Sequence, residues 1–449
     1  MFKTLKNAWK TPELQKKLLF TLFIVLLYRL GACVCVPFVS GNLASDFASA
    51  YGSSVLGMMS IFSGGAMQYA TLFALSVSPY ITASIVMQLL TIAIPPLERL
   101  AKNGPEGQKT INMITRIVTV VLAIITSVGY SFLLKKGNNG VSWLSIPEGV
   151  QEWFAMLVIN AAFCAGAALV MWLAELINDK GIGNGISVIL FANIISSMPS
   201  LASQMVSGLF GNQSTLGHWA WGIPIIIGIV AVVVATVFFV VWVTNSERRI
   251  PIQYAKRVVG RKMYGGQSTN LPIKLNMTGV MPIIFASSIV SIPATITAFI
   301  NDPNNGFVQF VESFLSPTSW LYLVLFLALT IAFSYFYIMI SFNPVEVANN
   351  INSNGGAIPG HRPGKPTVQY INRILKRVTL IGAFFLCIVA GVPMLVMVIV
   401  NAVPSVNLAF LAPLTFSGSS LLIVVGVVLE TIRDIEAQLS LRASKGFLN

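Results

Sequence analysis

The residues of this chain that could carry out chemistry are few and scattered. The two histidines, His218 and His361, lie far apart in the sequence. Neither has a serine, cysteine or carboxylate partner at a spacing typical of a catalytic or metal site. The chain has no phosphate-binding glycine-lysine motif and no cluster of carboxylates. The sequence therefore predicts that the protein is not an enzyme and uses no cofactor or metal ion.

The cysteines and the carboxylates of the apolar stretches have structural explanations. Cysteines placed in apolar stretches are expected to be small buried side chains rather than disulfide or metal sites; the four here are Cys33, Cys35, Cys164 and Cys387. Glu175 lies at the end of an apolar stretch, where snorkelling or pairing with Lys180 is the simplest expectation.

Ten apolar stretches dominate the chain, each near the ~20 residues that an α-helix needs to cross ~30 Å of hydrocarbon. They cover roughly 18–38, 71–94, 115–134, 154–177, 185–208, 221–243, 277–300, 319–342, 378–400 and 416–435. A composition of 55% hydrophobic and 10% charged residues is far from that of a soluble protein. The first stretch lacks a cleavage pattern, so we expect it to be retained. The predicted fold class is an all-α membrane protein with ten spanning helices.

Lysine and arginine fall in alternate gaps between these stretches. With the N-terminus in the cytoplasm, the outer loops hold only Lys135 and Lys136 among basic residues. The same loops carry acidic residues, namely Asp46, Glu148, Glu152, Asp302 and Glu312. This asymmetry predicts that both termini are cytoplasmic. It also accounts for most of the net charge of +13, so we expect no binding to DNA.

The uncharged outer loop 209–220 divides the stretches into two sets of five, in residues 1–208 and 221–449. An odd number in each half makes the halves enter the membrane from opposite sides, which predicts an inverted arrangement with a central site between them. An inverted-repeat secondary transporter fits the same topology. Such transporters carry ionisable groups at the membrane midplane, however, and these stretches hold almost none.

Three connecting segments are longer than simple turns. The gaps 244–276 and 343–377 are predicted to be cytosolic, and 39–70 is predicted to be an outer segment. The outer segment contains the apolar run 55–65, which is too short to span a membrane. Backbone at membrane depth needs burial in protein. We therefore expect a short helix folded back into a central funnel, with a lipid-facing interfacial helix as the alternative.

Two motifs stand out among the stretches. The segment 71–90 contains Pro79 and many small polar residues, which is typical of a closely packed helix that bends. The segment 172–190 contains Gly181, Gly183 and Gly185, which predict a tight turn between two spanning helices. Asn184 is suited to begin the second of these helices.

These two segments resemble the two signature regions of the SecY family, the channel subunits of the bacterial protein translocon. Ser76 is the one departure, because the family usually has glycine there. Serine is also small, so we expect little effect. The resemblance continues along the chain in ordered motifs: Phe62-Ser63-Gly64-Gly65-Ala66, Arg248-Arg249-Ile250, residues 254–257, 276–282 and 358–364, and finally Ser419–Val425.

The resemblance implies roles for particular residues. It implies a pore ring of Val77, Ile81, Ile186, Leu190, Ile284 and Ile423. It implies a plug of Val55, Leu56, Gly57, Met58, Met59, Ile61, Phe62, Gly64 and Gly65. A lateral gate between the second and third helices and the seventh and eighth would contain Ser84, Ile85, Gln88, Asn276, Ser287 and Ser288. A docking surface for a motor or ribosome would contain Arg248, Arg249, Lys256, Arg257, Arg261, Lys262 and Arg362.

The function implied by the resemblance is that of a protein-conducting channel in the bacterial cytoplasmic membrane. Such a channel translocates unfolded secretory polypeptides and releases hydrophobic segments sideways into lipid. The implied partners are SecE and SecG in a heterotrimer, the SecA ATPase or a translating ribosome, signal peptides, and membrane lipids. An accessory copy for specialised substrates would have the same sequence pattern.

Arg29 is an unusual charge inside an apolar stretch. An arginine at a helix centre costs roughly 2.5–3.5 kcal/mol on insertion scales. Two interpretations stay open. Arg29 is either a structural residue that faces the protein interior, or a residue that holds the channel closed or contacts a passing chain.

Overall fold

The computed structural model of the protein describes residues 9–40, 43–44, 46–47, 55–137, 142–147, 149–210, 219–254, 257–259, 262–264, 268–300, 306–316, 319–402 and 412–445. A helix overlaps each of the ten predicted apolar stretches. These helices are α2 (Pro12–Gly31), α5 (Ser78–Ala93), α7 (Pro105–Lys136), α8 (Glu152–Lys180), α9 (Gly185–Phe210), α10 (Trp219–Asn245), α11 (Met281–Ile300), α13 (Trp320–Ser341), α15 (Lys365–Ala402) and α16 (Ala412–Lys445).

The prediction of a helical, multi-pass membrane protein is confirmed. Six helices among the described residues are long and apolar enough to cross a membrane. A seventh span results if α5 is joined to α6 (Pro95–Lys102), from which it is bent by 106°. The count of ten is consistent with the helix positions.

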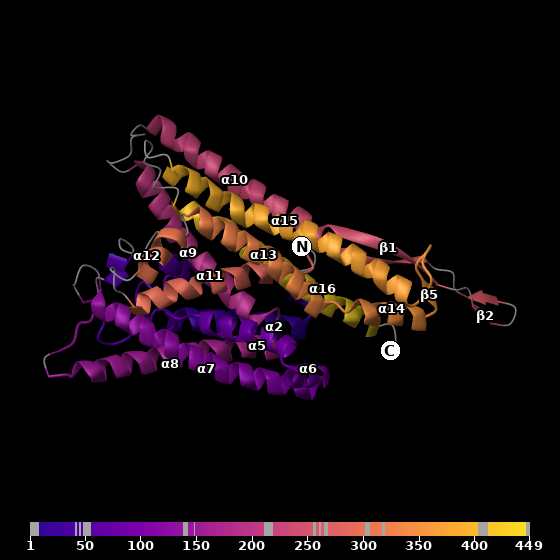
Figure 1. The fold of residues 1–449 in the computed structure, drawn as a ribbon, viewed down its shortest axis with the longest axis horizontal. Helices are drawn as coiled ribbons and strands as arrows, with labels where there is room; N and C mark the ends of the chain where they lie inside the picture. The colour runs from indigo at the N-terminus through magenta and orange to yellow at the C-terminus, as the bar shows by residue number, and fades with distance from the viewer. Residues whose placement is uncertain are drawn as a thin grey trace.

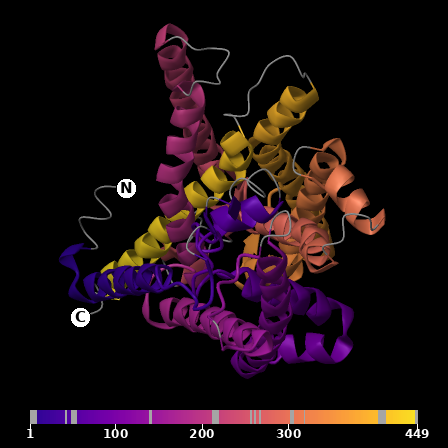
Figure 2. The same cartoon turned by 90° about the vertical axis from the view of Figure 1, so that its left-hand side faces the viewer.

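The helices lie in two groups that face each other. In Figures 1 and 2, α7 and α8 lie along one side of the molecule, and α10, α13 and α15 lie along the other. The groups meet where α11 packs against α5 and α7, and where α9 packs against α16. The short helix α4 (Val55–Phe62) packs against α9 and α11, between the groups.

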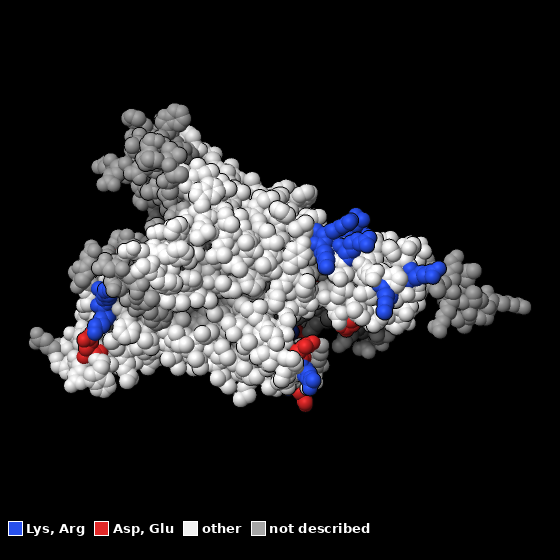
Figure 3. Space-filling model, in the orientation of Figure 1, with Lys and Arg blue, Asp and Glu red and all other residues white. Residues whose placement is uncertain are grey.

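Charged side chains gather at the two ends of the long axis on the face shown in Figure 3, and the band between them is uncharged. At one end, where α7 ends and α8 begins, Lys135 and Glu152 form an exposed ion pair of 2.6 Å. At the other end the basic residues dominate. An uncharged belt between charged ends is the surface expected of helices that cross a membrane.

Two predicted helix boundaries differ from the structure. The first stretch was expected to run to residue 38, but α2 ends at Gly31 and the chain continues without helix. Pro79 was expected to bend its helix, but it lies in the first turn of α5. Proline fits there because the first helical N–H groups need no partner within the helix. The bend lies at Ile94 instead, before Pro95 begins α6.

The glycine-rich turn between α8 and α9 has the predicted form. Gly183 has a φ of +80°, in the left-handed region that favours glycine. A Cβ atom on Gly185 would lie 1.9 Å from the carbonyl oxygen of Ala174, so α8 and α9 meet backbone to backbone there. The Oδ1 atom of Asn184 accepts a hydrogen bond of 3.1 Å from the N–H of Ile186, which confirms that Asn184 begins α9.

The two long loops that were predicted to be cytosolic form one β-containing unit, which the all-α prediction did not include. Strand β1 (Glu247–Tyr254) pairs antiparallel with β4 (Ser268–Lys274), and β5 (Gly356–Ala357) pairs with the other edge of β1. Strands β2 (Arg257–Val259) and β3 (Lys262–Tyr264) form a separate hairpin. A shared apolar cluster joins both loops to the helices: Ile250, Ile252, Ile273, Ile338, Ile351, Ile358, Ile371, Leu375 and Val378 are buried in it with Ala348. Helix α14 (Pro344–Ser353) contributes to it, and α12 (Gly306–Phe314) lies at the opposite end of the molecule.

Two expectations about single side chains were wrong. Cys33 and Cys35 are exposed rather than buried, because α2 ends before them. All four cysteines are free, as expected. Glu175 pairs with Arg116 of α7 at 2.7 Å rather than with Lys180, since helix packing brings Arg116 beside it.

Gly185→Ala is expected to lower the stability of the protein. The added methyl group needs space now filled by the Ala174 carbonyl, and overpacking of this kind costs typically 1–3 kcal/mol. The measurement is the apparent unfolding temperature of the protein purified in detergent.

Gly228→Ala is the matched control, because Gly228 also lies in a spanning helix and nothing is within 4 Å of its added methyl group. Its unfolding temperature is expected to stay equal or to rise, since alanine favours helix. Equal unfolding temperatures for the two variants would contradict the close approach of α8 and α9.

Candidate functional site

The six residues of the predicted pore ring lie in one apolar cluster between the two groups of helices. They come from four elements: the start of α5, α9, α11 and α16. Five of them are between 1% and 7% exposed, and Ile186 is partly buried against the same cluster. Side chains from both halves therefore fill the middle of the molecule, and the six ring residues among them are all aliphatic.

A small cavity of about 50 Å³ adjoins this ring. Ile81, Ile186 and Ile284 of the ring line it, together with Ser84 and Gln88 of α5. The Nε2 atom of Gln88 donates a hydrogen bond of 3.3 Å to the Ser84 hydroxyl, so these two predicted gate residues are partners one turn apart. The structure thus brings ring and gate residues to the same place.

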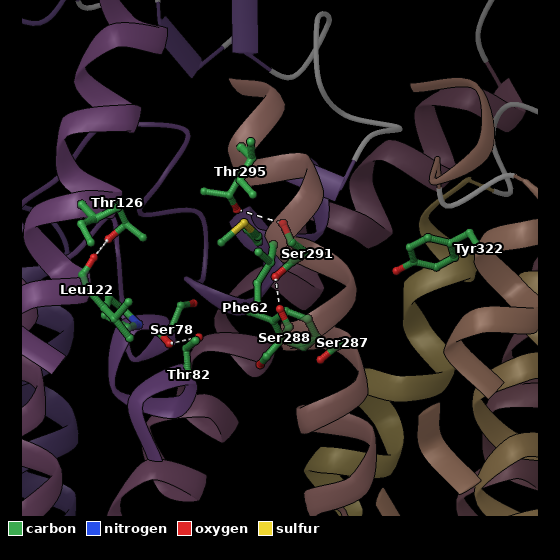
Figure 4. A pocket seen from close by; sticks show the side chains of 15 residues that line it. Phe62, Ser78, Thr82, Leu122, Thr126, Ser287, Ser288, Ser291, Thr295 and Tyr322 are labelled. Atoms are coloured by element: carbon green, nitrogen blue, oxygen red, sulfur yellow. Dashed lines mark hydrogen bonds between the residues drawn. The ribbon is translucent and has the colours of Figure 1, made fainter. Parts of the chain in front are cut away.

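A larger cavity of about 220 Å³ lies on the seam between α5, α7 and α11. Figure 4 shows hydroxyl-bearing side chains of α5 and α11 around it, with Phe62 of α4 between them and Tyr322 of α13 at one side. Ser287 and Ser288 of the predicted gate both line it.

The hydroxyls of this seam are satisfied within their own helices. Thr82 donates to the Ser78 carbonyl at 3.0 Å, and Ser288 donates to the Ile284 carbonyl at 2.8 Å. A side-chain hydroxyl that bonds to its own backbone needs no partner across the seam. The two sides of the seam can therefore separate without leaving these donors unpaired.

The remaining two predicted gate residues lie elsewhere. Ile85 is buried in the central cluster and lines neither cavity. Asn276 is buried before α11 begins, where its Oδ1 atom accepts a hydrogen bond from Thr278. Its Cα lies 3.8 Å from the position of a Cβ on Gly382, so Asn276 lies beside α15 and not in the seam.

The predicted plug forms α4 and the turn that follows it. Met59 and Phe62 line the larger cavity, and Ile61 and Phe62 pack against the central cluster. Gly57 is buried, and Gly64 and Gly65 have φ values of +67° and +84°. The side chains of Val55, Leu56 and Met58 lie outside what the structure describes. The expectation of a short helix folded into the centre, rather than one facing lipid, agrees with this position.

The predicted docking residues that the structure describes lie on the β-containing unit. Arg248 and Arg249 are exposed on β1, and Arg249 pairs with Glu247 at 2.7 Å. Burial, and then the positive charge of Arg433, lower the pKa of Lys274 on the neighbouring strand. Lys256 and Arg261 lie outside the described residues, and only the backbone of Arg257 and Lys262 is described.

Arg362 lies at the tip of the same unit, on a turn with fixed geometry. Gly360 and Gly364 flank it with φ values of +83° and +101°. Thr367 donates a hydrogen bond of 2.8 Å to the Arg362 carbonyl. The ring of His361 packs against that of Tyr370, with centroids 4.0 Å apart and the planes tilted by 31°. His361 is therefore a packing residue of this tip, and the exposed Arg362 side chain is presented on an ordered turn.

Comparison with known proteins agrees with this arrangement. The SecY family profile matches residues 71–432. A protein translocase subunit SecY of Streptomyces galbus is 41% identical over all of both chains. One of Corynebacterium glutamicum is 38% identical over 98% of this chain and 99% of the relative.

The chain belongs to the SecY family.

Solved structures of channels show the same fold. A structure described as that of a protein conducting channel superimposes with a TM-score of 0.60 at 16% identity, covering 94% of this chain and 92% of that one. Sec61 in the canine ribosome-channel complex covers the same shares with a TM-score of 0.56 at 14% identity. The two facing helix groups of this chain are therefore the arrangement of SecY and Sec61 channels.

Ser76 stands where the SecY family usually has glycine, and its small size is not the only property that matters there. Its φ is +49°, in the left-handed region. Glycine adopts this conformation without strain, and most other residues rarely do. Backbone conformation as well as size therefore matters at position 76, and this chain places a serine in a conformation that glycine adopts more easily.

Sequence reasoning missed several residues of this SecY-family site. Asn193 of α9 is fully buried beside α4, and its signal was an amide in the middle of an apolar stretch. Ser291 and Thr295 of α11 line the larger cavity. They follow Ser287 at intervals of four residues, a spacing that was visible in the sequence and marks one helix face.

Cysteines at Thr82 and Ser288 are expected to be joined by a short bifunctional thiol reagent, since both line the same cavity on opposite sides of the seam. The reaction is to be done in a protein whose four native cysteines are replaced by serine or alanine. Mass spectrometry of the linked peptides measures it.

The matched control pairs Thr82 with Ile381, which is exposed on α15 and lines neither cavity. Linking of the control pair at the same rate would contradict the proximity of α5 and α11.

Proposed function

We propose that the protein is the channel subunit of a protein translocase, and that it conducts unfolded secretory polypeptides across the bacterial cytoplasmic membrane. The observation that carries this proposal is the ring of six aliphatic side chains, to which both halves contribute. An apolar constriction resists ions because water leaves it readily, and it has no charge that would bind a passing chain of arbitrary sequence.

The seam between α5, α7 and α11 is proposed as the lateral gate. Its hydroxyls satisfy themselves within their helices, so opening exposes few unpaired polar groups. Hydrophobic segments of a substrate leave through this seam into lipid. Helix α4 is proposed as the plug that closes the outer side of the ring at rest; a related solved structure concerns a plug domain that stabilises the closed state of a SecY channel.

The energy for transport is proposed to come from partners. The inferred partners are SecE and SecG as companion subunits and either the SecA ATPase or a ribosome as the motor; one structural neighbour is a channel bound to a ribosome. The exposed Arg248 and Arg362 on the cytosolic unit supply a basic docking surface. On this proposal both termini are cytoplasmic and the chain itself is not an enzyme. An inverted-repeat transporter is disfavoured, because the six ring residues are aliphatic and offer no ionisable group to a solute or coupling ion.

Replacing Ile81 and Ile186 together with serine is expected to raise the resting ion leak of the reconstituted channel. Both side chains line the small cavity at the ring, so two hydroxyls there favour water in the constriction. The leak is expected to rise further when residues 55–65 are deleted. Single-channel recording in planar bilayers measures it.

Ile381→Ser together with Ile388→Ser is the matched control, since both residues are exposed on α15 and lie outside the ring cluster. A doubly substituted ring that stays as tight as the wild type, even without residues 55–65, would mean that these residues are not the seal.

Arg362→Glu is expected to abolish export while the protein remains inserted and assembled with its partners. The substitution reverses the charge of an exposed side chain. The turn that carries it is held by the Thr367 hydrogen bond and the contact between the rings of His361 and Tyr370. Protease protection of a secretory precursor in proteoliposomes that contain the channel and an ATPase measures export. This assay also tests the proposed function, since a wild-type protein that protects no precursor would overturn it.

Lys365→Glu is the control for charge alone, because Lys365 is exposed nearby at the start of α15. Normal export by a stably expressed Arg362→Glu protein would remove Arg362 from the docking surface.

A further inference from the structure

The last carbonyl of α4 is held by a side chain from another helix. The Nδ2 atom of Asn193 on α9 donates a hydrogen bond of 2.8 Å to the carbonyl oxygen of Phe62. The preceding carbonyls of α4 have partners in the turn that follows the helix: Met59, Ser60 and Ile61 accept from the N–H groups of Ser63, Gly65 and Gly64. Asn193 therefore makes the hydrogen bond that ties the end of α4 to the wall of the passage.

Asn193 is itself held in place by a buried polar group. It is fully buried, and its Nδ2 atom also donates a hydrogen bond of 3.0 Å to the Ser76 hydroxyl. The Ser76 oxygen lies 3.4 Å from the hydroxyl of Tyr28, and both residues are buried. The ring of Tyr28 stacks on Phe73 with centroids 5.2 Å apart. Elements α2, α9 and the segment before α5 thus fix the amide that contacts α4.

The direction of the amide follows from its partners. The Phe62 carbonyl can only accept, so the donor side of the Asn193 amide must face it. An aspartate in this position would place an acceptor against an acceptor, and a leucine would leave the carbonyl without its donor. The contact therefore needs the N–H donor of the asparagine amide, and a side chain of the same size without a donor would not replace it.

Arg29 encloses the other side of the same turn. Its guanidinium donates to the carbonyl of Ala192, the residue before Asn193. A Cβ on Gly64 would lie 2.7 Å from the Arg29 Nη2 atom and 3.1 Å from the Asn193 Cα, and the φ of Gly64 is +67°. The turn after α4 thus fits between Arg29 and Asn193 because residue 64 has no side chain. The cationic guanidinium also lies at the carbonyl end of α4, where the helix dipole favours it.

We propose that Asn193, oriented by Ser76 and Tyr28, is the latch that keeps α4 seated, and that release of its hydrogen bond to Phe62 must accompany displacement of α4. The proposal rests on the proposed function, in which α4 is the plug. When α4 moves away, the Asn193 amide keeps its hydrogen bond to Ser76 and stays directed at the position that the Phe62 carbonyl had occupied. Release of α4 therefore breaks one neutral hydrogen bond, whose net free energy is modest. The same hydrogen bond can form again when α4 returns.

The experiment compares four reconstituted channels: the wild type, Asn193→Leu, the deletion of residues 55–65, and the deletion combined with Asn193→Leu. Leucine keeps the approximate volume and removes the donor. We expect Asn193→Leu to raise the resting open probability roughly tenfold, the size of effect typical for loss of a donor to a buried acceptor. In the deletion background it is expected to add nothing, because the acceptor is absent.

A second readout does not require conduction. A cysteine at Ile61 of α4, in a protein without the native cysteines, is expected to react with an external thiol reagent about tenfold faster in the Asn193→Leu protein than in its parent, as the same loss of donor shifts the seating equilibrium. Asn160→Leu on α8 is the matched control, since it removes another amide from a spanning helix that is not beside α4. Its labelling rate and open probability are expected to match the parent.

Two outcomes would overturn the latch. The first is an Asn193→Leu protein with unchanged labelling and leak. The second is an equal rise in leak with and without residues 55–65, which would mean that Asn193 acts on the ring instead. Should Asn193→Leu not assemble, Asn193→Ser is measured with the same expectations, because the serine hydroxyl is too short to reach the same acceptor. A chain that conducts nothing would defeat the proposed function, while the labelling readout would still decide the latch.

Discussion

Backbone that leaves the helical conformation at membrane depth must find its hydrogen bonds inside the protein. The segment between α2 and α5 satisfies this constraint by pairing with itself. The N–H of Val36 donates to the Ala70 carbonyl at 3.1 Å, and the N–H of Leu72 donates to the Val34 carbonyl at 2.8 Å. The Tyr130 hydroxyl of α7 donates to the Met67 carbonyl. The backbone here is not helical, but the groups just named have hydrogen-bond partners. The position of α4, the start of α5 and the positions of Val77 and Ile81 depend on these bonds.

The polar groups between the two groups of helices are arranged in two different ways, one at the seam of α5, α7 and α11 and the other where α9 contacts α4. Seam hydroxyls such as Ser287 and Ser288 bond to the Ile284 carbonyl of their own helix, so the two sides hold each other through shape and apolar contact. Asn193 instead bonds across elements, to Phe62 and Ser76. On the proposed function, bonds within one helix suit a seam that opens widely, and a directional bond between elements suits a small helix that returns to one position.

Much of the architecture could be predicted from the sequence because hydrocarbon imposes length and charge rules on every span. The spans and the tight turn at Gly183 follow from apolar length and glycine spacing, and the pore-ring residues stay a prediction from the family motifs. The end of α2 and the start of α5 could not be predicted, because tertiary hydrogen bonds of residues 32–40 and 63–77 override their apolar character. The partner of Glu175 and the position of Asn276 beside α15 depend on which helices are neighbours, and periodicity carries no such information.

The two long loops that carry the strands also could not be predicted from local patterns, and they connect to the helices of the seam. Their strands pair residues about a hundred positions apart, Gln253 with Ala357, which no local pattern predicts. The resulting unit buries Ile250 and Ile273 against Ile338 of α13 and Leu375 of α15. Leu275, directly after β4, donates its N–H to the Ser246 carbonyl at 2.9 Å just before α11 begins. Packed apolar interiors move as rigid bodies rather than deform continuously. The exposed Arg362 therefore lies on a unit that is continuous with α11, the helix that forms one whole side of the seam.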